Sequence, residues 1–215
     1  MAYINNKKYI KLSKEASANE GKVLGNEINH QYSKSFEFEK DFREYTKNYF
    51  TEYIEYFSLL RCWNEFQIVK EFVKHPKYLV VFRSCNLGSK KNIWCGDCSK
   101  CLYVYIMLYP FIPKQKLIEI FGKDMLDYEE YKQMFLGLIS DNYDKPFECV
   151  GTKEEINYAL SISIKKYKDL PLLLNYYKDN FYEENKNYNI EDYFNYENFI
   201  NDKFLKMMGY DKNEK

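Results

Sequence analysis

The chain lacks an excess of charge of either sign. Its 32 lysine and arginine residues are balanced by 32 aspartate and glutamate residues over a length of 215. Without a net charge, no overall field attracts nucleic acid or an anionic membrane surface. A local basic site is still compatible with this balance, so nucleic-acid binding is disfavoured and not excluded. The length suffices for one large or two small domains with a sizeable core.

Long hydrophobic runs are also missing. The N-terminal sequence MAYINNKKYIKLSKE has no apolar h-region, so no secretory signal is predicted. The longest apolar stretch, Leu102 to Pro113, is about twelve residues long. A helix that spans a bilayer needs about 20 residues. This stretch is therefore expected to be a buried helix. With no secretory signal and no net charge, the chain is expected to be a soluble, cytoplasmic protein whose partners include neither nucleic acid nor a membrane.

Cysteine is concentrated in one place. Two overlapping C-x2-C units lie close to a further thiol, with nine, two and two intervening residues between Cys85, Cys95, Cys98 and Cys101. This spacing suits a tetrahedral Zn²⁺ site with four thiolate ligands, and Gly96 allows the backbone to turn there. The alternatives are reduced cysteines packed as small hydrophobic residues, or disulfides, which nothing in the chain favours. A closed site of this kind is structural and does not reveal the function.

Hydrophobic periodicity predicts strands at the front of the chain and helices behind them, so the expected fold class is α/β passing into mostly α. Strands are expected at 9–12 and 78–82, and a strand or turn at 56–60. Helices are expected at 36–54, 64–74, 102–109, 114–121 and 128–138. Thr152 should cap a further helix with Glu155 at the capping-box position, and the chain beyond about Lys165 is expected to be helical.

A polar, glycine-bearing loop at 13–25 follows the first expected strand. In open α/β sheets, ligands bind at the carboxyl ends of the strands, which makes this loop a candidate site. A dense group of hydrogen-bond donors, NHQYSKS at 29–35, comes next. By its spacing alone, this group is interpreted as a solvated turn that ends in an N-cap serine.

Four segments taken together resemble the MurL-type epimerases, which act on UDP-MurNAc-L-alanyl-L-glutamate in bacterial wall synthesis. The resemblance covers roughly residues 8–160 and corresponds to the C-terminal half to two-thirds of that family. The segments are KEASANE at 14–20, NHQYSKSFE at 29–37, YFSLLR at 56–61 with the stretch 82–101, and KPFECVG at 145–151. The family is itself similar to the PP-loop ATP pyrophosphatases, and the cysteine pattern resembles the zinc loop of 7-cyano-7-deazaguanine synthase. A partial PP-loop (HUP-like) sheet is therefore implied.

The resemblance implies a reaction in which ATP activates the α-carboxylate of the terminal L-glutamate as an acyl-adenylate. Activation acidifies the Cα proton, and removal and return of this proton on opposite faces inverts the centre. Hydrolysis then releases the D-glutamyl product, AMP and pyrophosphate. ATP, Mg²⁺ and a structural Zn²⁺ are the implied cofactors, and a UDP-MurNAc-dipeptide is the implied substrate.

Candidate proton carriers follow from the same resemblance. His30 is the candidate histidine base, because His75 precedes a proline at a helix end. Glu148 and Cys149 are alternative proton carriers, since a thiol suits the inversion of an amino-acid centre. A small buried residue in an extended segment is the structural alternative for Cys149.

The resemblance also implies contacts to ATP and substrate. Glu15 and Glu20 lie in the loop after the first strand, where they could hold Mg²⁺ or a ribose hydroxyl. Arg61 and Arg83 are candidates for binding a carboxylate or phosphate, and a structural arginine is an equal interpretation of both. The remaining binding candidates are Asn19, Asn29, Gln31, Ser33, Lys34 and Lys145.

One motif of the PP-loop superfamily has no counterpart here, namely the Ser-Gly-Gly-x-Asp-Ser phosphate loop. The chain is therefore expected to be a fragment, or to work with a separate N-terminal half that carries this loop. The expected division is 1–84 as the C-terminal part of a nucleotide-binding domain, 85–160 as zinc loop and helical subdomain, and 161–215 as a helical tail.

Two other functions remain open. Another PP-loop enzyme, such as a protein similar to 7-cyano-7-deazaguanine synthase, would share the cysteine loop. A zinc-ribbon module that binds nucleic acid or a protein would need a basic face near the cysteines, and Lys90, Lys91 and Lys100 supply part of one.

Overall fold

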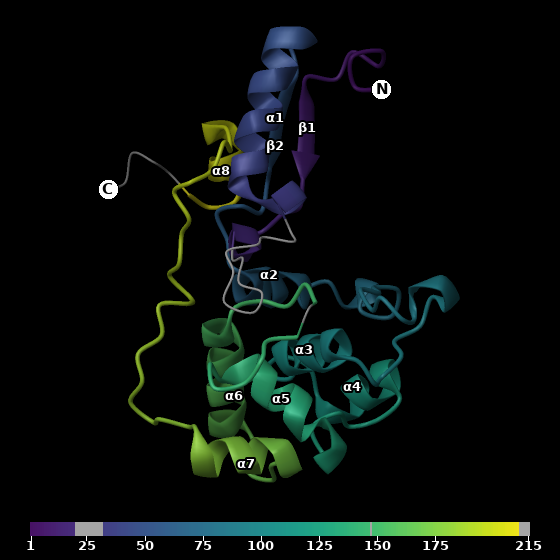
Figure 1. Ribbon diagram of the computed structural model, residues 1–215, viewed down its shortest axis with the longest axis vertical. Coiled ribbons are helices and arrows are strands. Elements are labelled where there is room, and N and C mark those ends of the chain that lie inside the picture. The colour runs from purple at the N-terminus through teal and green to yellow at the C-terminus, as the bar shows by residue number, and fades with distance from the viewer. Residues whose placement is uncertain (20–31, 147, 211–215) are drawn as a thin grey trace. The chain divides into compact units, whose positions relative to one another are not determined.

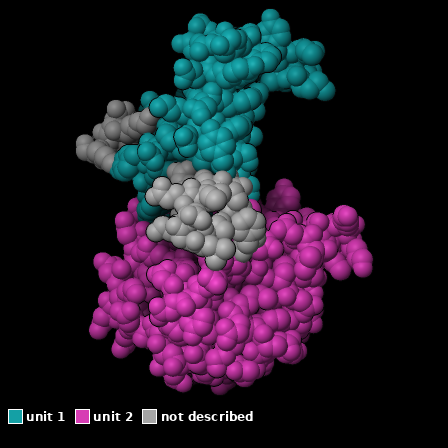
Figure 2. All heavy atoms as spheres, viewed as in Figure 1, with its two compact units in different colours: residues 1–64, 193–215 teal, residues 65–192 magenta. Residues whose placement is uncertain are grey.

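The computed structural model describes residues 1–19, 32–146 and 148–210, with the backbone alone for residues 18–19. Two compact units emerge, coloured separately in Figure 2. Unit 1 comprises residues 1–64 and 193–215, and unit 2 comprises residues 65–192. The division into 1–84, 85–160 and 161–215 that the sequence suggests concerns functional parts and stays a prediction.

Unit 1 contains a βαβ arrangement. β1 (Tyr9–Leu12) pairs in parallel with β2 (Glu55–Ser58), and α1 (Phe36–Tyr49) lies between them in the chain (Figure 1). Parallel strands need such a crossover connection. Phe57 of β2 is fully buried, and its ring centroid lies 5.5 Å from that of Phe204 in α8 (Asp202–Met207). The sheet and α8 thus form the apolar core of this unit.

α1 begins at a capping residue. Ser35 is its N-cap, and the hydroxyl of Ser35 accepts a hydrogen bond of 3.1 Å from the backbone N–H of Phe38. The predicted N-cap serine is thereby confirmed. The helix ends at Tyr49, five residues before the predicted end at Ile54. Two 3₁₀ turns, η1 (Ala16–Asn19) and η2 (Tyr32–Lys34), lie between β1 and α1.

The outer edge of β2 is covered by side chains of α1. Oε1 of Glu39 accepts a hydrogen bond of 2.9 Å from the N–H of Ser58. The guanidinium of Arg43 donates to the carbonyl oxygen of Tyr56. Backbone groups that would otherwise recruit another strand are therefore occupied.

Among the described residues, no strand pairs with the outer edge of β1. The carbonyl oxygens of Lys8 and Leu12 accept hydrogen bonds of 2.8 Å from the neighbouring strand segment. Because peptide groups alternate in direction along a strand, those of Tyr9 and Lys11 point away from β2. Within the described part of the chain, no hydrogen-bond partner is found for them. A parallel sheet of two strands with one open edge is small for its class, since parallel sheets are normally covered on both faces.

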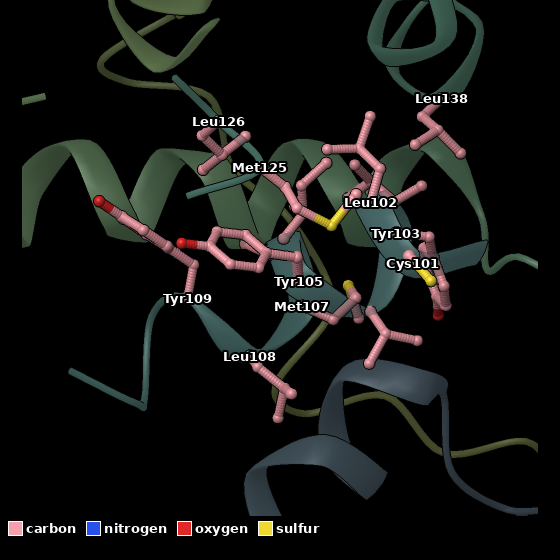
Figure 3. Close-up of a cluster of buried hydrophobic side chains, with 14 of the residues drawn as sticks. Cys101, Leu102, Tyr103, Tyr105, Met107, Leu108, Tyr109, Met125, Leu126 and Leu138 are labelled. Carbon is pink, nitrogen blue, oxygen red and sulfur yellow. The ribbon is translucent and has the colours of Figure 1, made fainter. Parts of the chain in front are cut away.

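Unit 2 is helical and is built around α3 (Ser99–Leu108), which is buried on all sides from Cys101 to Leu108. Figure 3 shows side chains of this helix pointing in several directions into the core, with Cys101 and Tyr103 at the end of the helix away from Tyr109. A helix that is apolar all round has to be surrounded by others. Its neighbours are α2 (Glu65–Phe72), α4 (Lys114–Phe121), α5 (Lys132–Ile139) and α6 (Lys153–Lys166), and α7 (Leu172–Asn180) packs on α6.

Several predicted elements of unit 2 are confirmed. α4 begins and ends at the predicted residues, and α3 is the buried helix expected at 102–109. Before α6, the Thr152 hydroxyl accepts a hydrogen bond of 3.1 Å from the N–H of Glu155, and the Glu155 carboxylate accepts one of 2.7 Å from the N–H of Thr152. This is the predicted capping box.

The predicted strand at 78–82 is wrong. Pro76 opens a 3₁₀ turn, η3 (Pro76–Tyr78), and the N–H of Phe82 bonds to the carbonyl of Tyr78 at 2.8 Å. Val80 and Val81 are 52% and 62% exposed. A β-branched run forms a buried strand only when another strand is available to pair with it, and unit 2 has none among its described residues.

The helical prediction beyond Lys165 is correct for α7 and α8 only, since residues 181–201 contain no helix. The protein is thus a mixed α/β protein with a small parallel sheet, and its larger unit is helical. Among the described residues, none of the helices has the length and apolar character that a bilayer crossing needs.

Candidate functional site

The four cysteines predicted to hold a metal come together in unit 2. Their sulfur atoms all lie within 4.8 Å of one another, in the set Cys85, Cys95, Cys98 and Cys101. Sulfur–sulfur distances of 3.8, 3.6 and 3.5 Å separate the 85–98, 95–101 and 98–101 pairs. Thiolates about 2.3 Å from a tetrahedral ion lie about 3.8 Å apart, so this donor set fits a single metal ion.

Local structure holds these sulfur atoms in place. Cys98 is the N-cap of α3, and Cys101 lies in the first turn of that helix. Gly96 adopts a φ of +74°, a backbone conformation that favours glycine. Two backbone N–H groups donate hydrogen bonds to sulfur atoms of the cluster. The N–H of Gly88 donates to Cys85 at 3.1 Å, and the N–H of Asp97 donates to Cys95 at 3.4 Å. Such bonds stabilise thiolate over thiol, as a metal ligand requires.

The thiols also act on one another. The hydrogen bond between the Cys98 and Cys101 sulfur atoms lowers the pKa of Cys98 to about 5, and the same bond, together with burial, raises the pKa of Cys101. The arrangement therefore favours the thiolate form of Cys98, which is the form that binds a metal ion.

The turn between Cys95 and Cys98 is fastened to the rest of unit 2. The carboxylate of Asp97 lies 2.7 Å from the ammonium group of Lys123 and accepts a hydrogen bond of 2.7 Å from the Tyr131 hydroxyl. The same hydroxyl lies 3.0 Å from the carbonyl oxygen of Gly96. The hydrogen bond from Lys123 is the main cause of the lowered pKa of Asp97.

Two of the three candidate proton carriers lie in a half-buried segment of unit 2. Oε2 of Glu148 accepts a hydrogen bond of 2.6 Å from the amide of Asn86. The carbonyl oxygen of Cys149 accepts one from the ammonium group of Lys100. Lys145, in the same segment, is also half-buried. Asn86 and Lys100 flank cysteines of the cluster, and the sequence pattern did not single them out for this contact.

Arg61 is buried in unit 1. It is fully shielded from solvent, and its guanidinium lies 3.1 Å from the equally buried carboxylate of Glu39. It also donates to the carbonyl oxygens of Glu15 and Lys34, at 2.8 and 2.6 Å. Its Nε has no partner among the described residues. These contacts fit the structural interpretation of Arg61, which ties the segments after β1 and before α1 to the carboxyl end of β2.

Lys14 is a functional candidate that the sequence pattern did not reveal. It follows β1, its ammonium group donates to the carbonyl of Ser33, and it lies 4.9 Å from the ring centroid of Phe38. Burial and the charge of Arg61 lower the pKa of Lys14. Sequence periodicity carries no signal for this residue, because Ser33, Phe38 and Arg61 lie 19, 24 and 47 positions after it in the chain.

The other candidates divide into two groups. Ser33 is exposed, whereas Glu15, Lys34 and Arg83 are half-buried, and the Arg83 guanidinium donates to the carbonyls of Phe82 and Asn92. Glu20, Asn29, His30 and Gln31 lie outside the described residues, as does the side chain of Asn19. The roles suggested for all of these residues stay predictions.

Comparisons with known proteins give a consistent result. The family model described as the MurL N-terminal domain matches residues 1–59, and the one described as the MurL C-terminal domain matches residues 81–189. No solved structure matches the chain at a significant level.

Curated relatives share the same family. A protein of Xanthomonas oryzae pv. oryzae is 35% identical over 169 residues, which are 75% of this chain and 38% of the relative. A protein of Micromonospora sp. is 35% identical over 180 residues, which are 80% of this chain and 40% of the relative. Both are named UDP-N-acetyl-alpha-D-muramoyl-L-alanyl-L-glutamate epimerase. The chain thus spans about two-fifths of the length of these relatives, and by the domains it matches it belongs to the MurL family.

Proposed function

We propose that this chain is part of an ATP-dependent epimerase that converts the terminal L-glutamate of UDP-MurNAc-L-Ala-L-Glu into D-glutamate. The observation that carries the proposal is the 35% identity to proteins named for this epimerase activity, over 75–80% of the chain. The chain spans only about two-fifths of the length of those relatives, so the activity of the isolated chain has to be measured separately from that of the whole enzyme.

The proposed chemistry solves a problem of acidity. A proton on the carbon beside a carboxylate is hard to remove, because the product would carry two adjacent negative charges. Transfer of AMP from ATP to the α-carboxylate, with release of pyrophosphate, removes the charge and lets the acyl group accept the electron pair. Return of a proton to the other face inverts the centre. Water then cleaves the acyl–phosphate bond and releases AMP.

In this proposal, residues of the chain carry the proton and bind the anions. His30, Cys149 and Glu148 are the candidates for moving the Cα proton, and a half-buried thiol or carboxylate suits that task. Lys34 and Lys14 supply positive charge at the carboxyl ends of β1 and β2, where open α/β sheets bind ligands. Glu15 lies on the same segment and is the described candidate for binding Mg²⁺.

We propose zinc as the ion of the four-cysteine centre. Four thiolates in a tetrahedral set are typical of zinc or an iron–sulfur cluster, and the compact loop with two C-x2-C units favours zinc. Reduced thiols also favour the cytoplasm as the location. A closed site of four cysteines leaves no open coordination position, so the proposed ion stabilises the loop and takes no part in the chemistry.

We further propose that the sheet of unit 1 is part of a larger PP-loop (HUP-like) sheet. The parallel pairing of β1 and β2 around α1 supports this proposal, and so does the open edge of β1. The proposed occupant of that edge is a strand from an N-terminal half of the enzyme that carries the phosphate loop. Lys11 beside that edge disfavours pairing with a second copy of β1.

Lys11→Pro is expected to weaken binding of such a half by about tenfold, because it removes the N–H that points away from β2. The pairing of β1 with β2 does not use this N–H, so the unit should stay folded. Binding can be measured by titrating in the portion of the Xanthomonas oryzae relative that precedes its matched segment. Lys11→Ala is the control for loss of the side chain, and an equal effect of both variants would contradict the proposed pairing.

The activity test supplies the purified chain with ATP, Mg²⁺ and UDP-MurNAc-L-Ala-L-Glu, with and without that N-terminal portion. We expect substrate-dependent release of AMP and the appearance of D-glutamate when both parts are present. AMP release without inversion would point to a different PP-loop enzyme. The absence of both products from the combined, folded and zinc-loaded parts would refute the proposed function.

The binding-module alternative gains nothing from the structure. Of the three lysines that supplied part of its basic face, Lys100 donates its ammonium group to the carbonyl of Cys149. Lys90 and Lys91 are left as the exposed lysines of the loop.

A further inference from the structure

The residue after Cys85, the first of the four cysteines in the chain, is hydrogen-bonded to Glu148, one of the candidate proton carriers. Asn86 is the neighbour of Cys85, and its amide donates the 2.6 Å hydrogen bond to Oε2 of Glu148. Consecutive Cα atoms lie about 3.8 Å apart, so an ion that fixes Cys85 also restricts where Asn86 can lie. The orientation of the Glu148 carboxylate thus depends on the first ligand.

The last ligand is preceded by a second such residue. Lys100 is the neighbour of Cys101 in the first turn of α3, and its ammonium group donates to the carbonyl oxygen of Cys149. The same ammonium group lies 5.0 Å from the ring centroid of Tyr103. A charge-assisted bond from a rigid helix fixes the backbone of the residue that accepts it.

The far end of the segment is packed against α3 as well. A Cβ at Gly151 would lie 2.7 Å from the Tyr103 hydroxyl and 2.8 Å from Oε2 of Glu155, so a larger residue there would have to displace these side chains. Tyr103 is 3% exposed, and its hydroxyl has no hydrogen-bond partner among the described residues. Glu155 accepts bonds of 2.6 and 2.7 Å from the N–H groups of Glu65 and Thr152. The segment 148–151 is therefore held at both ends.

We propose that the cysteine centre positions Glu148 and Cys149 through Asn86 and Lys100. A bound metal ion would hold Cys85 and Cys101 in the arrangement that their sulfur atoms have here, and the two neighbours would then hold the segment that carries the acid and the thiol. Asn86 and Lys100 are positioning residues in this arrangement. The use of Glu148 and Cys149 in proton transfer rests on the proposed function, whereas their positioning by the centre does not.

The rate at which iodoacetamide alkylates Cys149 tests this proposal, with each labelled cysteine identified by peptide mass spectrometry. In the zinc-loaded chain, Lys100→Met is expected to raise the rate about tenfold, because the lost charge-assisted bond shifts local opening by about that factor. Asn86→Ala is expected to raise it about threefold, since an amide bond is weaker. Lys90→Met, an exposed lysine of the same loop, is the matched control and should leave the rate unchanged.

Removal of zinc from the unmodified chain should raise the rate at Cys149 at least as much as Lys100→Met does, because it releases Asn86 as well as Lys100. In Lys100→Met the same treatment should add no more than the share of Asn86, about threefold, because the connection through Lys100 is already broken. Unchanged labelling in both zinc-loaded variants would overturn the proposal, even if the zinc-free chain unfolds. Zinc content and thermal unfolding, measured on each variant, separate local release of the segment from general destabilisation. The assay contains no substrate, so failure of the epimerase proposal would leave its result unaffected.

Discussion

Cys98→Ser is expected to abolish stoichiometric zinc binding and to lower the melting temperature of unit 2 by about 10 °C or more. A thiolate provides one of four ligands, and a serine hydroxyl does not replace it at neutral pH. Structural zinc contributes about 10–16 kcal/mol in the smallest zinc domains. Unit 2 retains the core around α3, so we expect a loss of about 5 kcal/mol, which corresponds to about 10–20 °C for a protein of this size.

Cys149→Ser is the matched control for this prediction. Cys149 lies outside the four-cysteine set and is half-buried, so its replacement should leave zinc content and melting temperature unchanged. Metal analysis after gel filtration and thermal scans with and without a chelator give both quantities. A Cys98→Ser protein that retained one zinc ion per chain would show that the four sulfur atoms are not the ligand set.

The metal centre was predictable because its signal is local. Four cysteines within 17 residues predict a common site, and their sulfur atoms lie within 4.8 Å of one another. The capping box before α6 was predictable for the same reason, since Thr152 and Glu155 are one helical turn apart. Patterns that close within a turn or a short loop specify their own geometry.

Long-range partners were not predictable. Arg61 was a candidate ligand for a phosphate or carboxylate, and its burial against Glu39 depends on how α1 packs beside β2. The run at 78–82 has the composition of a buried strand, but a strand needs a neighbour that sequence periodicity does not supply. In the same way, the contacts of Asn86 and Lys100 to the segment 148–151 join residues 62 and 49 positions apart. Contacts between residues far apart in the chain depend on tertiary packing, and the sequence pattern did not predict them.

Loss of either partner of the Arg61–Glu39 pair is expected to cost about 3–5 kcal/mol in the stability of unit 1. Both side chains are fully buried, so Glu39→Gln leaves a guanidinium without its counter-charge, and Arg61→Met leaves a carboxylate. Arg61→Met also leaves the carbonyl oxygens of Glu15 and Lys34 without this hydrogen-bond donor. These two residues lie in the segments after β1 and before α1. We expect the melting temperature of unit 1 to fall by about 6–20 °C in either variant.

The double variant Glu39→Gln with Arg61→Met, which combines the two single changes, distinguishes a buried ion pair from simple packing. When both charges are removed, no uncompensated charge remains, so the double variant should be more stable than either single one. Zinc content is the internal control, because all four cysteines belong to unit 2 and should bind metal as before. Single variants that lose less than about 1 kcal/mol would place the pair in the range of exposed salt bridges and contradict its burial.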